Sequence, residues 1–138
     1  YDSLPYIHMP EVLSKNDERY NTYFIPKLTD DQLEIVIHSL IRQENIVQIE
    51  RILLEKNYTF TIDHIEKNWG YCPRSISWLI ETEKIVLDQL LHDWILQQPS
   101  QGMRNMQPVQ DFVKAKFLND SLSKVLQQQE KEFKKNKI

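Results

Sequence analysis

The chain has 138 residues, of which 41% are hydrophobic and 27% are charged, as in a single globular domain with a sizeable core. Its net charge of -3 disfavours a nucleic-acid-binding domain that relies on general electrostatic attraction. The single cysteine, Cys72, excludes an internal disulfide and a cysteine-based zinc site, and no stretch is apolar for long enough to cross a membrane.

The N-terminal part differs in composition from the rest of the chain. Residues 1–28 contain three prolines and a polar run. Proline disfavours continuous helix, so we predict an extended segment with at most a short helix after Pro10. Its aromatic residues suggest that it packs on the body, a single all-helical domain formed by residues 29–138.

The first helix of this domain is predicted to start at Thr29. Thr29 and Gln32 have the spacing of a capping box, and apolar residues recur at helical spacing from Leu33 to Ile41. Asn45 is a plausible cap for a second helix, from about Ile46 to Lys56.

Three further helices are predicted toward the C-terminus. A short one is capped by Thr61 and ends at Gly70. Pro73 is suited to the first position of a long helix that reaches about Gln98, and Pro108 opens a last helix that reaches about residue 135. The prediction is an all-α fold of five or six helices, in which a small bundle packs on a long C-terminal antiparallel helical hairpin.

Residues 61–79 resemble a helix-turn-helix unit. Ile65, Gly70, Ile76 and Leu79 occupy the positions of its apolar pins and its turn glycine. In such a unit the second helix reads the major groove of DNA, which would make Arg74, Ser75 and Ser77 the nucleic-acid contacts. We keep this as an alternative function, because only one of these side chains is positively charged.

Residues 33–60 resemble one unit of a pentatricopeptide or related helical-hairpin repeat. The resemblance rests on apolar spacing alone, at Leu33, Ile37, Leu40, Ile41, Ile49, Ile52 and Leu53. Such repeats read RNA, so the resemblance implies an RNA-binding fragment as a further alternative. A clear second copy of the unit is missing from the sequence.

The leading functional hypothesis is a surface for another protein subunit or a peptide. Trp78 and Ile85 lie seven residues apart and off the main apolar stripe of the predicted long helix, and tryptophan is a favoured interface anchor. Met103 and Met106, in the polar loop 99–107, form a second candidate contact. The charged C-terminal end is expected to project beyond the body.

Catalytic residues are not apparent. His92 and Asp93 are neighbours whose side chains would point about 100° apart on a helix, and no nucleophile accompanies them. No phosphate-binding loop or metal-ligand spacing is present, so we expect no enzyme, cofactor, metal or small-molecule substrate. We therefore predict a non-catalytic interaction module within a larger eukaryotic protein, most plausibly a nuclear one, with mitochondria as the alternative location.

Overall fold

A computed structural model describes residues 17–136 of the chain, with side chains described as far as residue 134. Within this range the fold consists of seven α-helices and one short 3-10 helix, and the described residues form no β-strand. The all-α prediction is therefore confirmed, although the described part alone contains more than the five or six helices expected. The helices are α2 (Glu18–Phe24), η2 (Ile25–Lys27), α3 (Asp30–Arg42), α4 (Ile46–Leu53), α5 (Ile62–Glu66), α6 (Pro73–Glu81), α7 (Gln89–Gln97) and α8 (Gln107–Asn136).

Side-chain caps fix several of the helix starts that the sequence predicts. The Thr29 hydroxyl accepts a hydrogen bond from the Gln32 backbone N–H at 3.2 Å, and the Gln32 side chain accepts one from the Thr29 N–H at 3.0 Å. The Asn45 side chain accepts a bond from the Gln48 N–H, which begins α4. These caps satisfy backbone donors that a helix leaves unpaired at its N-terminus.

The sequence predicts an extended N-terminal segment with at most a short helix after Pro10, whereas residues 18–27 are helical throughout, as α2 followed by η2. Asp17 caps α2 by accepting a hydrogen bond from the Arg19 N–H at 2.9 Å, and η2 follows with Pro26 in its first turn. Phe24, Ile25 and Leu28 are buried in the core, as expected for a segment that packs on the body. Residues 1–16 lie outside the described residues.

The long helix predicted from Pro73 to Gln98 is two helices, so the predicted long hairpin does not form. The chain leaves α6 after Glu81, and Glu83 adopts a left-handed backbone conformation with φ of 58°. Asp88 then accepts a hydrogen bond from the Leu91 N–H at 2.8 Å and begins α7. Burial of Ile85 explains the break, since the loop 82–88 turns this side chain into the core.

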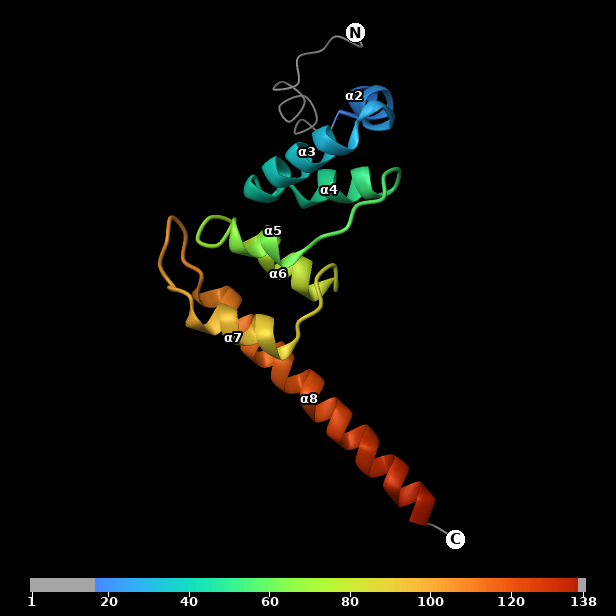
Figure 1. Ribbon diagram of the computed structural model, residues 1–138, viewed down its shortest axis with the longest axis vertical. Coiled ribbons are helices and arrows are strands. Elements are labelled where there is room, and N and C mark those ends of the chain that lie inside the picture. Colours follow the sequence, from blue (N-terminus) through green and yellow to red (C-terminus); the bar gives the residue numbers. More distant parts are fainter. Residues whose placement is uncertain (1–16, 137–138) are drawn as a thin grey trace.

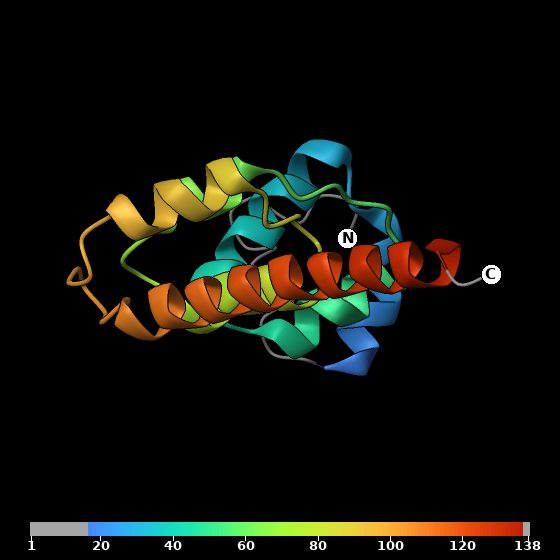
Figure 2. The ribbon, with the colours of Figure 1, turned by 90° about the horizontal axis from the view of Figure 1, so that it is seen from below.

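The helices lie in successive layers, which Figure 1 shows from top to bottom. α2, α3 and α4 form the first layer, α5 and α6 the second, and α7 with the start of α8 the third. The layers touch through α3 against α6 and α6 against α8. Seen along the long axis, α8 runs beside α7 and across the layers behind it (Figure 2). The second half of α8 extends away from the layers.

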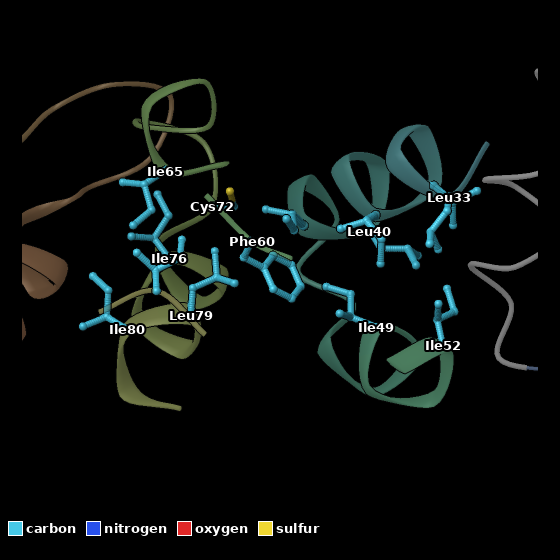
Figure 3. Close-up of a cluster of buried hydrophobic side chains, with 14 of the residues drawn as sticks. Leu33, Leu40, Ile49, Ile52, Phe60, Ile65, Cys72, Ile76, Leu79 and Ile80 are labelled. Atoms are coloured by element: carbon cyan, nitrogen blue, oxygen red, sulfur yellow. The ribbon is translucent and has the colours of Figure 1, made fainter. Parts of the chain in front are cut away.

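One continuous core joins the layers. Figure 3 shows Leu33 and Leu40 from α3 facing Ile49 and Ile52 from α4, and Ile76, Leu79 and Ile80 from α6 on the other side of Phe60. Phe60 therefore lies between the first and second layers. Most of this core consists of the apolar residues that the sequence places at helical spacing.

The chain's two glycines meet where the loop between α7 and α8 crosses the turn before α6. Gly70 has a φ of 92°, and a Cβ on Gly102 would lie 2.9 Å from the Gly70 Cα. The Arg104 N–H donates to the Gly70 carbonyl at 2.9 Å. Only glycine at position 102 allows this approach between two backbones.

Glu44 connects three parts of the fold. It lies in the turn between α3 and α4, with a left-handed φ of 57°. One carboxylate oxygen accepts the backbone N–H of Arg74, the second residue of α6, at 2.7 Å. The other accepts Nη1 of Arg104 at 3.1 Å. Glu44 therefore acts as an N-terminal cap for α6 from outside that helix.

Candidate functional site

The middle of α8 carries apolar side chains that the rest of the described protein leaves uncovered. Leu118, Leu122, Val125 and Leu126 are between 51% and 63% exposed. Since each helical residue is rotated by about 100° from the one before, these four lie within a strip about 100° wide. We call these four residues the α8 stripe.

The α8 stripe faces away from the body of the protein. The first turns of α8 bury Val109 and Val113, and this part of the helix packs against α6 and α7. Counting about 100° per residue, the mean direction of the α8 stripe is about 175° from that of Val109 and Val113. The stripe is therefore not an extension of the face that packs on the body.

A second surface is a groove of about 440 Å³ around Trp78. It is lined mainly by one face of α6, together with the first residues of α4 and α8. We call it the Trp78 groove, and its lining residues are Ile46, Pro73, Arg74, Ser77, Trp78, Glu81, Pro108 and Val109. Four of its five α6 residues, Arg74, Ser77, Trp78 and Glu81, have the spacing i, i+3, i+4, i+7, which places them on one helix face.

Trp78 is half-buried, and its ring contacts the core residue Phe60. Phe60 makes an edge-to-face contact with it, with ring centroids 6.2 Å apart and planes at 88°. The opposite face of α6 is buried through Ile76, Leu79 and Ile80. Trp78 therefore lies between core and surface.

Opposite charges stand at the two ends of the Trp78 groove. Arg74 and Glu81 are seven residues apart on α6, or about 10 Å along the helix. Both are exposed, and among the described residues neither side chain has an ion-pair partner. A ligand with the reverse arrangement of charges could therefore pair with both.

Two of the four predicted contact residues are wrong. Ile85 is only 8% exposed and Met106 is fully buried, so both belong to the core. The prediction for Ile85 assumed a continuous helix, and the break after α6 removes the spacing on which it depended. Met103 is 81% exposed, in the loop between α7 and α8. The structure does not bring Met103 into the Trp78 groove.

The predicted nucleic-acid contacts do not form a common basic surface. Ser75 is buried and its hydroxyl donates to the Ile41 carbonyl at 2.7 Å, so its assignment as a nucleic-acid contact is wrong. Ser77 is half-buried in the Trp78 groove, and Arg74 is exposed. The surroundings of Arg74 include the carboxylate of Glu44, which accepts its backbone N–H.

His92 and Asp93 hydrogen-bond at 2.9 Å, although the sequence predicts that their side chains diverge, and in the described part of the chain no nucleophile is bonded to either of them. Cys72, by contrast, is buried. Burial raises the pKa of the Cys72 thiol to about 12, and the thiol contacts the Asn68 carbonyl at 3.6 Å. Such a thiol is a poor nucleophile at neutral pH. Residues 17–136 contain no group of three or more histidine, cysteine, aspartate or glutamate side chains able to hold a metal ion. In the same range no helix is long and apolar enough to cross a membrane.

Comparison of the chain with profiles of known protein families, with curated proteins and with solved structures gave no match. The candidate site consists of two surfaces, the α8 stripe and the Trp78 groove. Since no known protein matches the chain, a function for these surfaces has to be argued from their geometry.

Proposed function

We propose that this protein is a non-catalytic protein-interaction module whose α8 stripe packs against an amphipathic helix of another protein subunit or of a peptide. The observation that carries the proposal is the exposure of four apolar side chains on the side of α8 opposite the body. Contiguous exposed apolar surface of this kind marks interaction sites in soluble proteins.

The shape of the α8 stripe favours a helical partner. The stripe is narrow, straight and on a projecting helix, so another helix can lie along it with apolar residues at i, i+4 and i+7. A half-exposed leucine or valine leaves roughly 1 kcal/mol of burial free energy unrealised, so the four residues supply about 4 kcal/mol. This gain does not exceed the entropic cost of association, which favours a partner that also uses a second surface.

The Trp78 groove is the second surface that we propose. A partner segment with an apolar side chain against Trp78 would place an acidic residue near Arg74 and a basic residue near Glu81. Exposed ion pairs add little affinity but fix the direction of a bound segment. Charge reversal with Arg74→Glu and Glu81→Lys should therefore reverse the charges that the protein prefers in a bound segment. It should leave the fold unchanged, because both side chains are exposed.

Site-specific photo-crosslinking in native cell extract tests the role of the α8 stripe. A photoreactive amino acid is placed at Leu122, on the stripe, or at Gln127, which is exposed and about 140° away around the same helix. We expect a discrete covalent adduct from position 122 and none from position 127. The double variant Leu118→Glu/Leu126→Glu, with the crosslinker at 122, should lose the adduct and keep its helical circular dichroism.

Equal crosslinking at 122 and 127, or no discrete adduct from 122, would contradict the proposal. Purified protein at high concentration serves as the control for self-association. An adduct with a second copy of the chain would identify the partner as the protein itself.

Duplex DNA binding through α6 receives little support from this arrangement. Of the three predicted contacts only Arg74 offers an exposed positive charge, and Glu81 lies on the same helix face. Titration with mixed-sequence DNA and RNA at low salt, with Arg74→Glu as the comparison, tests both nucleic-acid alternatives, because nucleic-acid binding weakens steeply with salt.

A further inference from the structure

Two histidines stack between the first and second layers. The rings of His38, on α3, and His64, on α5, have centroids 4.4 Å apart and planes within 4° of parallel. His64 is buried and His38 is half-buried. Tyr58 and Phe60 contact the His64 ring edge-to-face at 5.5 and 5.3 Å. The stack is thus one of the contacts through which α5 meets α3.

The hydrogen bonds of His64 require its neutral form. The Thr61 backbone N–H donates to Nδ1 at 3.0 Å, so Nδ1 carries no proton. The proton of the neutral ring is then on Nε2, which donates to the Tyr58 hydroxyl oxygen at 2.7 Å. Burial raises the pKa of Tyr58 to about 12, so the phenol stays uncharged. A second proton on His64 has to displace the Thr61 N–H from Nδ1, and it would then face the Thr61 carbonyl oxygen, which lies 3.2 Å from Nδ1.

The same cap occurs elsewhere in the chain with a side chain that cannot titrate. At the start of α3 the Gln32 side chain accepts the Thr29 N–H at 3.0 Å, three residues after the capping threonine. At the start of α5 His64 has this role toward Thr61. The two caps therefore differ in their response to pH. A glutamine oxygen accepts a hydrogen bond at any pH near neutral, whereas a histidine nitrogen stops accepting when it gains a proton.

Charged groups from each neighbouring element face the histidine pair. Glu34 of α3 lies 3.8 Å from His38 Nε2 and, with Asp63 of α5, favours the protonated rings. Arg42 of α3 and Lys67 after α5 oppose protonation of His38. Burial is the largest influence on both rings and lowers both pKa values. His38 further lowers the pKa of His64, whereas the contact of its ring with the Thr61 backbone carbonyl raises it.

We propose that the His38–His64 stack is a proton-sensitive latch that holds the start of α5 on α3 at neutral pH and releases it on acidification. The neutral rings are favoured in the fold, whereas an unfolded chain takes up protons near pH 6.5. The stabilisation is therefore fully present above pH 6.5 and is lost as the pH falls below it. For each ring that stays neutral in the folded protein, the folding equilibrium constant falls by up to about tenfold for every pH unit below about 6.5. This inference is independent of the proposed protein interaction.

The test is urea denaturation of the full chain between pH 7.5 and pH 5.0. His64→Gln copies the Thr29–Gln32 cap and should fold at pH 7.5. In the wild type the logarithm of the folding equilibrium constant falls between pH 7.5 and pH 5.0, and in this variant the fall should be at most half as large. His92→Gln is the matched control, because His92 Nδ1 is bonded to the Asp93 carboxylate and not to a backbone N–H. It should retain the loss of stability on acidification.

A second variant and a spectroscopic measurement keep the proposal testable if His64→Gln does not fold. His38→Phe keeps a stacked ring but removes one titrating group, so it should also weaken the pH dependence. In the wild type, NMR should show the Thr61 amide resonance shifting together with the His64 ring signals. Variants with the wild-type pH dependence, or a Thr61 amide that does not respond while His64 titrates, would overturn the proposal.

Discussion

Replacement of Glu44 by alanine removes the carboxylate that holds α6 to the turn between α3 and α4 and to the loop after α7. The hydrogen bond from the Arg74 backbone N–H is the main loss, because the Glu44 side chain is only 12% exposed. A hydrogen bond to a charged group contributes about 1.5–3 kcal/mol, and loss of an N-terminal cap costs about 0.5–2 kcal/mol. The ion pair with the half-exposed Arg104 adds between about 0 and 1 kcal/mol. We expect Glu44→Ala to lower the free energy of unfolding by about 2 kcal/mol, or the Tm by roughly 8 °C.

Comparing glycine with alanine at position 44 separates the loss of the cap from the effect of backbone strain. Residue 44 has a φ of 57°, which costs a residue with a side chain roughly 1 kcal/mol relative to glycine. Glu44→Gly should therefore be about 1 kcal/mol more stable than Glu44→Ala, while Glu44→Gln keeps an acceptor and should lie closest to the wild type. Urea denaturation followed by circular dichroism measures all three. If Glu44→Ala unfolds at the wild-type urea concentration, the carboxylate does not cap α6.

Three other substitutions test the packing of the helices by the same denaturation measurement. Gly102→Ala should cost about 1–3 kcal/mol because its Cβ would lie 2.9 Å from the Gly70 Cα, and stability equal to the wild type would show that the two backbones can separate without loss. Asp88→Ala should cost about 1 kcal/mol by removing the cap of α7, and an unchanged midpoint would contradict this assignment. Ile80→Ala should cost about 2–5 kcal/mol, whereas Leu126→Ala should change stability by less than about 0.5 kcal/mol, and a large loss for Leu126→Ala would place the α8 stripe in a core.

Local sequence signals predicted the helix starts well where a capping side chain acts within its own helix. Thr29 with Gln32, and Asn45, cap α3 and α4 as predicted. Asp88 is an equally clear cap, but the apolar spacing on both sides of it favoured one continuous helix. The left-handed conformation of Glu83 has no sequence signature, because glutamate rarely adopts it.

The candidate site was less accessible from the sequence, because exposure depends on which elements pack together. Trp78 is half-buried against Phe60, whereas Ile85 and Met106 are core residues that the loops carry inward. The spacing of Leu118, Leu122, Val125 and Leu126 predicts an apolar helix face. Only the packing of Val109 and Val113 shows that this face is directed away from the body.

The two apolar faces of α8 belong to one unbroken helix, and the number of residues between them sets the angle at which they stand. Inserting one residue between Val113 and Leu118 would turn the outer face by about 100° and advance it by about 1.5 Å, with every apolar side chain retained. A helix packed on the α8 stripe would then lie on a different side of α8 relative to the body. If a partner helix packs on the α8 stripe as proposed, the number of residues in this segment sets its direction relative to the body.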